Sequence, residues 1–221
     1  MWLSLAAGVV LAAGAANPAL RFLALGDSYT IGEGVASNEN WPHQLAAALR
    51  AQGVSIAEPE IVARTGWTTD ELSAAMDTHA FHPPYDLVTL LIGVNNQYRG
   101  RDLENYRVEF RTLLERAIAL AGGDARRVLV VSIPDWGVTR FGAESGRNRT
   151  QIAHEIDAFN VAALDVAASL HARHVDVTAI SRSRGGDAGM LVADGLHPSA
   201  AMYARWTTVI APQAQAALRQ R

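Results

Sequence analysis

The chain contains no lysine and no cysteine, and these two absences exclude several kinds of catalysis. Its 19 basic residues are all arginines. Without lysine there is no P-loop side chain to bind nucleotide phosphates and no amine for Schiff-base or Ser-Lys catalysis. Without cysteine there is no thiol nucleophile, no disulfide bond and no cysteine-ligated zinc or iron–sulfur centre. The lack of cysteine also leaves the redox compartment of the protein open.

Charge of one sign is not in excess either, because the formal net charge at pH 7 is only -3. A protein that binds nucleic acid electrostatically needs a strongly basic face, so we expect no nucleic-acid partner. Hydrophobic residues make up 49% of the chain and charged residues 19%, as in ordinary globular proteins. The 221 residues suffice for one well-buried core, and no linker divides them. We therefore predict a single domain over residues 21–221.

The N-terminus carries no charged side chain between Trp2 and Leu20. Its stretch "LSLAAGVVLAAGAA" ends in small residues that fit an A-x-A cleavage pattern at Ala13 and Ala15. We interpret residues 1–16 as a signal peptide, which predicts a secreted or periplasmic protein. The uncharged run is also long enough to span a bilayer, so an uncleaved membrane anchor is the alternative.

Beyond residue 20, short apolar runs alternate with longer segments of helical periodicity. Such alternation predicts an α/β fold, with a parallel sheet covered by helices on both faces. We expect a three-layer α/β/α sandwich whose five strands cover residues 21–25, 60–64, 86–94, 127–133 and 174–180. Ligands of such sheets bind beyond the carboxyl ends of the strands, so the residues that follow each strand are the candidates for function.

Residues suited to acyl transfer follow several of these predicted strands. Ser28 is a candidate nucleophile, and His197 is a candidate base to accept its proton. Asp194 precedes His197 by three residues and is placed to orient the imidazole. Donors for a developing oxyanion are available from the backbone N–H groups of Ser28 and Gly66 and from the side-chain amide of Asn95.

At these residues the chain resembles the SGNH/GDSL hydrolase family, which is named after four sequence blocks. The matching stretches, in family order, are "GDSYT" (26–30), "TGWTT" (65–69), "GVNN" (93–96) and "DGLHP" (194–198). The resemblance implies a flavodoxin-like sheet of strand order 2-1-3-4-5, a Ser28–His197–Asp194 triad, and an oxyanion hole formed by Ser28, Gly66 and Asn95. It also implies activity without a cofactor. Members of the family are esterases, lipases, lysophospholipases, thioesterases and carbohydrate deacetylases.

Two positions depart from the family pattern. The third block commonly reads G-x-N-D, and this chain has Asn96 in place of the aspartate. In the second block a bulky Trp67 follows Gly66. Together with Tyr98, Trp136 and Phe141, Trp67 is expected to line an acyl or sugar pocket, with ordinary packing of these aromatic rings as the alternative.

Each proposed catalytic residue also has a structural interpretation. Ser28 is a suitable helix N-cap, Asp194 a suitable turn former beside Gly195, and Asn95 a residue that can satisfy its own turn. We expect Asp27 to be structural, with its carboxylate bound to nearby backbone N–H groups. A phosphate-binding loop is excluded at "GDSYTIGEG" because the stretch matches neither nucleotide-binding glycine pattern.

Two remaining groups of residues have no predicted catalytic role. Two histidine pairs, His79/His82 and His171/His174, have no third ligand placed nearby in the sequence, so we expect no metal site. Arg99 and Arg101 are suited to a phosphate or carboxylate head group, or equally to a solvated surface.

The sequence as a whole predicts a serine ester hydrolase that forms an acyl-enzyme at Ser28 with a lipid or small acyl ester as substrate. A carbohydrate O-deacetylase of the same fold is the alternative within enzymes. A lipid- or glycan-binding protein without activity is the alternative from another class.

Overall fold

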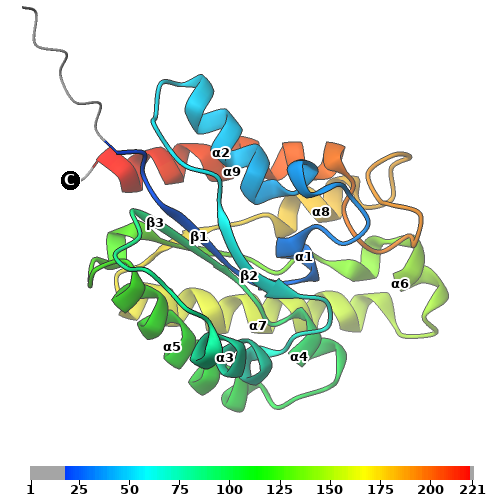
Figure 1. The fold of residues 1–221 in the computed structure, drawn as a ribbon. Helices are drawn as coiled ribbons and strands as arrows, with labels where there is room; N and C mark the ends of the chain where they lie inside the picture. The colour runs from blue at the N-terminus through cyan, green and yellow to red at the C-terminus, as the bar shows by residue number, and fades with distance from the viewer. Residues whose placement is uncertain (1–17, 220–221) are drawn as a thin grey trace, which may run out of the picture.

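The computed structural model describes residues 18–219, and the predicted signal peptide lies outside them. Within this range five parallel strands form one sheet of order β2-β1-β3-β4-β5 (Figure 1). The strands are β1 (Phe22–Asp27), β2 (Glu60–Arg64), β3 (Leu87–Leu91), β4 (Val128–Val131) and β5 (Arg173–Val175). The predicted α/β/α sandwich with strand order 2-1-3-4-5 is confirmed.

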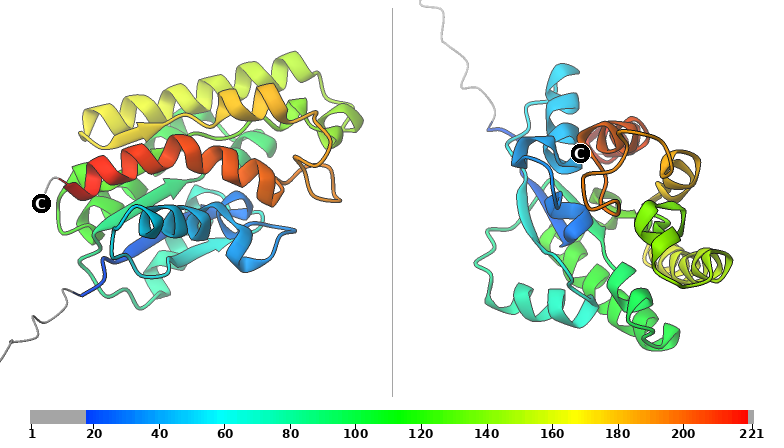
Figure 2. Two further views of the ribbon diagram at one scale, coloured as in Figure 1. Left: turned by 90° about the horizontal axis from the view of Figure 1, so that it is seen from above. Right: turned by 90° about the vertical axis from the view of Figure 1, so that its right-hand side faces the viewer.

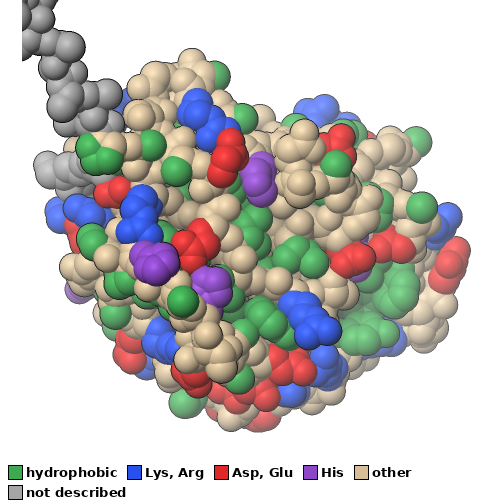
Figure 3. All heavy atoms as spheres, in the orientation of Figure 1, with side chains coloured by type: hydrophobic (Ala, Val, Ile, Leu, Met, Phe, Trp, Pro, Cys, Tyr) green, Lys and Arg blue, Asp and Glu red, His purple; other side chains and the backbone are tan. Residues whose placement is uncertain are grey.

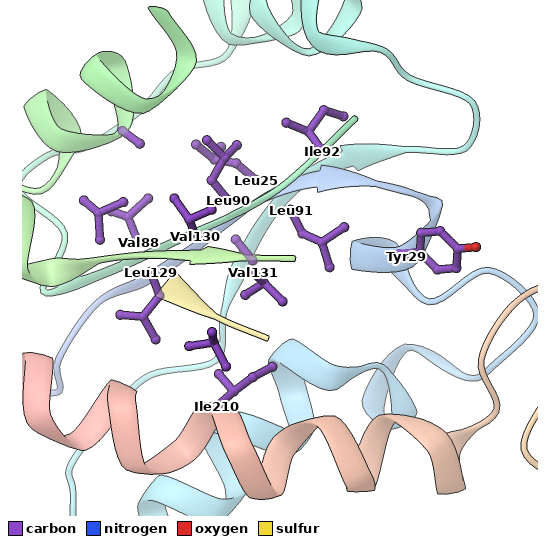
Figure 4. Close-up of a cluster of buried hydrophobic side chains, with 14 of the residues drawn as sticks. Leu25, Tyr29, Val88, Leu90, Leu91, Ile92, Leu129, Val130, Val131 and Ile210 are labelled. Atoms are coloured by element: carbon purple, nitrogen blue, oxygen red, sulfur yellow. The ribbon is translucent and has the colours of Figure 1, made fainter. Parts of the chain in front are cut away.

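The three central strands are buried along their whole length, whereas the edge strands β2 and β5 are partly exposed. Alternate side chains of a strand point to opposite faces, so continuous apolar runs fit strands covered on both sides. Figure 4 shows Leu129 and Val131 on the side of Ile210 of α9, and Leu90 and Val130 on the opposite side. The core therefore lies on both faces of the sheet.

Two groups of helices provide the outer layers (Figure 2). One face is covered by α2 (Trp41–Ala51) and α9 (Ala200–Arg219), which pack against each other, with α8 (Thr178–Arg184) beside α9. The other face is covered by α3 (Thr69–Thr78), α5 (Leu103–Leu120) and α7 (Arg149–Ser169). Among residues 18–219, none of the helices combines the length and the apolar character needed to cross a membrane.

Three short helices, α1 (Ser28–Ile31), α4 (Val94–Tyr98) and α6 (Arg140–Glu144), follow the carboxyl ends of β1, β3 and β4. The single-turn 3₁₀ helices are η1 (Ser37–Glu39), η2 (Ala125–Arg127) and η3 (Trp136–Val138). A local sequence signal accounts for the start of α3. A capping box is present there, with Glu71 accepting a hydrogen bond of 2.9 Å from the backbone N–H of Thr68.

The last predicted strand, residues 174–180, is wrong over its second half. Only Arg173–Val175 is extended, because the Asp176 side chain accepts a hydrogen bond of 2.7 Å from the N–H of Thr178. This bond satisfies a free donor at the beginning of α8, which occupies the last three positions of the predicted strand. The apolar run had no feature that distinguished a strand from a buried helix.

Gly93 turns the chain from β3 into α4 and requires the absence of a side chain. Its φ is +129°, and a Cβ at this position would lie 2.6 Å from the Cε2 atom of Tyr106. The Tyr106 hydroxyl donates a hydrogen bond of 3.1 Å to the carbonyl of Ile92, which fixes the ring in this place. The turn therefore depends on glycine for two reasons, the backbone conformation and the close ring.

We predict that Gly93→Ala lowers the free energy of unfolding by about 2–4 kcal/mol, since backbone strain and steric overlap add. Gly53→Ala is the matched control, because Gly53 also has a positive φ of +84° but nothing within 4 Å of its would-be Cβ. The control should cost only about 1–2 kcal/mol. Urea denaturation of both variants measures the difference, and equal losses would contradict the role of the Tyr106 ring.

Candidate active site

Ser28 is the first residue of α1 and lies directly after β1, with 4% of its surface exposed. The N-cap of this helix is Asp27, whose Oδ1 atom accepts a hydrogen bond of 3.0 Å from the N–H of Tyr29. The helix is thus capped by Asp27 and not by Ser28, and the expected bond of Asp27 to the backbone is present. The hydroxyl of Ser28 is available for another partner.

That partner is His197, from the loop that precedes α9. The Nε2 atom of His197 lies 3.0 Å from Ser28 Oγ, and its Nδ1 atom lies 2.6 Å from Asp194 Oδ2. The second carboxylate oxygen of Asp194 accepts hydrogen bonds from the N–H groups of Leu196 (2.7 Å) and His197 (3.0 Å). The structure therefore brings together the three side chains that the sequence placed in a triad.

The charge of Asp194 follows from these bonds. Partial burial acts to raise the pKa of Asp194, but the hydrogen bonds from the His197 ring and from the two backbone N–H groups outweigh it and hold the pKa below its ordinary value. Asp194 is thus a carboxylate at neutral pH and an acceptor for Nδ1–H. With the proton on Nδ1, the Nε2 atom of His197 is the acceptor for the Ser28 hydroxyl.

Ser28 and His197 line a cavity of about 200 Å³ together with Gly66 and Asn95. Gly66 has a φ of +86°, a conformation that favours glycine. The Asn95 side chain donates one hydrogen bond of 2.9 Å to the carbonyl of Trp67, which uses one of the two N–H groups of the amide. All four residues named for the nucleophile, the base and the oxyanion donors thus share one cavity.

The apolar part of this cavity includes Tyr98, Trp136 and Phe141, in agreement with the expected pocket residues. In the space-filling view, hydrophobic side chains gather in the area between α4 and α6 (Figure 3). Tyr98 lies edge-on to Trp136, with ring centroids 5.4 Å apart, and Phe141 lies 5.9 Å from Trp136. Three aromatic rings, one each from α4, η3 and α6, therefore form one wall of the cavity.

Trp67 is the exception among the expected pocket residues. It is absent from the described residues that line the cavity, and its side chain packs against the hydrophobic core instead. The Trp67 side chain is only partly buried there. The carbonyl of Trp67 still serves the site, because it holds the Asn95 amide.

A polar network that the sequence did not reveal fixes the aromatic wall. Trp136 Nε1 donates a hydrogen bond of 2.8 Å to Gln97, and Gln97 donates one of 2.5 Å to Glu155. Arg147 binds the same Glu155 oxygen at 2.8 Å, and its guanidinium lies 5.2 Å from the centroid of the Trp136 ring. Apart from the proximity of Gln97 to Asn95, no sequence signal pointed to these residues, since their partners lie up to 58 positions away.

Asn96, the departure from the third family block, is fully buried between α4 and α3. It accepts a hydrogen bond of 3.1 Å from the N–H of Thr69 and donates one of 2.6 Å to the Thr69 hydroxyl. The Thr69 hydroxyl in turn donates to Glu109. An aspartate at position 96 could only accept, so the amide allows the hydroxyl proton to bind Glu109. Asn96 therefore fixes the helix that carries Asn95 without burying a charge.

Two other observations concern possible ligand sites. Within the described part of the chain, no group of three histidine or acidic residues is arranged to hold a metal ion. A larger and more open cavity, of about 550 Å³, lies beside α6 and is lined by Arg140, Arg149 and Gly195. It contains none of the proposed catalytic side chains, so the smaller cavity with Ser28 is the candidate active site.

Asp27 differs from Asp194 in its surroundings, although both are close to Ser28 in space or sequence. Its surface is completely buried, and among the described residues its Oδ2 atom has no hydrogen-bond partner. Burial raises the pKa of Asp27 to about 7, although hydrogen bonds from the backbone act in the opposite direction. An unfolded aspartate releases its proton near pH 4. Between these pH values the folded protein binds one more proton than the unfolded chain, so the free energy of unfolding falls as pH rises.

We predict that Asp27→Asn removes this pH dependence, because the amide is neutral in both states. The variant should gain stability relative to the parent protein as pH rises from 5 to 8, and chemical denaturation at several pH values measures this difference. Asp187→Asn, at an exposed position, is the control and should not change the slope. If the stability of Asp27→Asn and that of the parent protein changed in parallel with pH, the pKa of the buried Asp27 carboxyl would not be raised.

Comparison with known proteins places this chain in a family. The model of the GDSL-like lipase/acylhydrolase family matches residues 24–205. A search of the curated proteins found no match. Among solved structures, TesA superposes with a TM-score of 0.71 at 22% identity and covers 90% of this chain and 99% of its own.

Two further solved structures have the same fold. A lipase/acylhydrolase from Enterococcus faecalis has a TM-score of 0.67 at 21% identity, over 88% of this chain and 94% of its own. An acetyl xylan esterase from Geobacillus stearothermophilus has a TM-score of 0.67 at 18% identity, over 89% and 95%. The family match spans 182 of the 221 residues, so the chain belongs to the GDSL-like lipase/acylhydrolase family of carboxylic ester hydrolases.

Proposed function

We propose that the protein is a serine ester hydrolase that forms an acyl-enzyme at Ser28. The observation that carries this proposal is the continuous hydrogen-bond chain from Ser28 through His197 to Asp194, at the wall of an apolar cavity. His197 Nε2 accepts the Ser28 proton while Oγ attacks the ester carbonyl carbon. The negative charge that develops on the carbonyl oxygen is stabilised by the N–H groups of Ser28 and Gly66 and by the amide of Asn95.

The second half of the reaction uses the same groups. The tetrahedral intermediate collapses, the ester C–O bond breaks, and His197 gives its proton to the leaving alcohol. A water molecule then loses a proton to His197 and attacks the acyl-enzyme, which releases the carboxylic acid and restores Ser28. Because His197 must be neutral to accept each proton, acid pH suppresses both steps.

The shape of the cavity supports a short, uncharged acyl group. No arginine, aspartate or glutamate side chain is among the described residues that line it. A volume of about 200 Å³ corresponds to about six groups of the size of water. We infer that acyl chains of about two to six carbons fit inside, and that longer chains extend into solvent. An acetylated sugar is the second candidate, because an acetyl group fits and Tyr98, 48% exposed at the cavity, offers a ring for stacking.

We predict that a fluorophosphonate probe labels the protein at Ser28. Ser28→Ala should abolish the labelling and lower kcat for p-nitrophenyl butyrate by at least about 10³-fold, since the nucleophile is lost. Ser37→Ala, a substitution of an exposed serine outside the cavity, is the matched control and should keep both activities. A folded parent protein that neither labels nor hydrolyses esters would favour the binding protein without activity.

We also predict a limit on acyl length. In a series of p-nitrophenyl esters, kcat/KM should rise with acyl length up to about six carbons and then stop rising. Each methylene buried in the cavity contributes about 0.8 kcal/mol of binding free energy, and a methylene outside the cavity contributes none of it. Phe141→Ala enlarges the cavity and should move the optimum toward longer chains.

The control for this prediction is Phe81→Ala, which removes a half-buried ring away from the site and should leave the optimum in place. An acetylated xylo-oligosaccharide and a lysophospholipid are measured beside the series. Faster hydrolysis of the acetylated sugar than of any p-nitrophenyl ester would favour the deacetylase, and an equal shift in both phenylalanine variants would contradict the assignment of Phe141.

A further inference from the structure

Arg99 lies next to both side-chain and backbone donors of the candidate oxyanion hole. It directly follows α4, the helix that carries Asn95, and its backbone N–H donates a hydrogen bond of 3.0 Å to the carbonyl of Asn95. Its guanidinium extends to the loop after β2, where Nη2 donates a hydrogen bond of 2.6 Å to the carbonyl of Gly66. One residue thus contacts both Asn95 and Gly66.

Gly66 lies in a turn that is closed by a hydrogen bond of 3.2 Å from the N–H of Trp67 to the carbonyl of Arg64. Glycine adopts positive and negative φ with similar ease, so the observed φ of +86° is not enforced by the residue itself. Contacts on both sides hold the loop, since the Thr65 hydroxyl donates to Glu33 and the carbonyl of Trp67 accepts from Asn95. Among residues 18–219, the bond from Arg99 is the side-chain hydrogen bond to Gly66 itself.

Arg99 is itself fixed at the beginning of α3. Its Nη1 atom lies 3.3 Å from Glu71 Oε2, and the same oxygen accepts the N–H of Thr68 at 2.9 Å. Hydrogen bonds from the backbone of Thr68 and the charge of Arg99 keep the pKa of Glu71 below its ordinary value, so this partner is negatively charged at neutral pH. Figure 1 shows α3 and α4 next to each other at this edge, and the Asn96–Thr69 bonds join them.

We propose that Arg99 is a positioning residue of the oxyanion hole, which holds the Gly66 carbonyl and thereby the orientation of the adjoining Thr65–Gly66 peptide, whose N–H is the donor, relative to the Asn95 amide. This inference rests on the proposed function, in which Gly66 and Asn95 stabilise the oxyanion. Hydrogen bonds from a charged donor are about twice as strong as neutral ones, so the guanidinium restrains the carbonyl more than a neutral side chain would. Since donors must be in place before the charge develops, loss of this restraint affects the transition state more than the bound substrate.

The same contacts argue against the other interpretation of the two arginines. The guanidinium of Arg99 lies between Gly66 and Glu71, and Arg101 pairs with Asp70 at 2.6 Å. A head group would have to compete with a carboxylate that is already in place at each arginine. Arg101 has no bond to Gly66, so it provides a matched control on the same segment of chain.

The experiment compares Arg99→Met with Arg101→Met, using p-nitrophenyl butyrate and a fluorophosphonate that leaves a tetrahedral adduct on Ser28. Arg99→Met should lower kcat and the rate of inactivation together by about 10- to 100-fold, the range expected from a donor displaced by about 1 Å, with KM changed less than about twofold. Arg101→Met should leave all three quantities within about twofold of the parent. Arg99→Lys should recover part of the loss, because an ammonium group can still donate to the Gly66 carbonyl.

Three outcomes would overturn the proposal. Equal effects of the two methionine variants would show that Arg99 contributes only surface charge. A raised KM with unchanged kcat would show that Arg99 binds the substrate. Arg99 would have a purely structural role if Arg99→Met lost kcat only in proportion to a lower melting temperature, and if Arg99→Lys folded stably but recovered no kcat. Failure of the proposed function is distinct from all three, because the parent protein itself would then not be labelled.

Discussion

The hydrogen bond between Ser28 and His197 joins residues 169 positions apart, and the arrangement of the whole chain is what brings them to 3.0 Å. Ser28 is placed by β1 in the middle of the sheet, and His197 by the loop before α9. Tyr29 connects the two, since its ring centroid lies 5.6 Å from that of His197 and 6.2 Å from that of Trp206 on α9. The packing of α9 against α2 and the sheet therefore sets the geometry of the candidate triad.

Two carboxyl groups near Ser28 show how environment assigns different states to the same chemical group. Asp194 is partly exposed and receives three hydrogen bonds, which favour its charged form. Asp27 is buried, and burial raises its pKa to about 7. The residue that orients His197 is thus negative at neutral pH, whereas the residue adjacent to Ser28 in sequence is close to its point of titration. The distinction follows from desolvation and hydrogen bonding, not from residue type.

The candidate site is held by contacts between neighbouring loops, not by its own backbone. The Asn95 amide is tied to Trp67, the Gly66 carbonyl to Arg99, and the Trp136 indole to Gln97. The first two bonds link the segments that follow β2 and β3, on either side of β1, and the third links those that follow β3 and β4. Short loops on a rigid parallel sheet leave few ways for such groups to move independently, which favours donors that are already oriented before substrate binds.

The sequence by itself determined the alternation of strands and helices, and the edge of the sheet where the candidate residues Ser28, Gly66, Asn95 and the Asp194–His197 pair lie. Apolar periodicity and short motifs carry this information because they depend on residues close together in the chain. Only the tertiary structure decided that Trp67 packs against the core and not around the cavity, and that Arg99 meets Gly66. These outcomes depend on partners distant in sequence, and on competition for burial that a local pattern does not record.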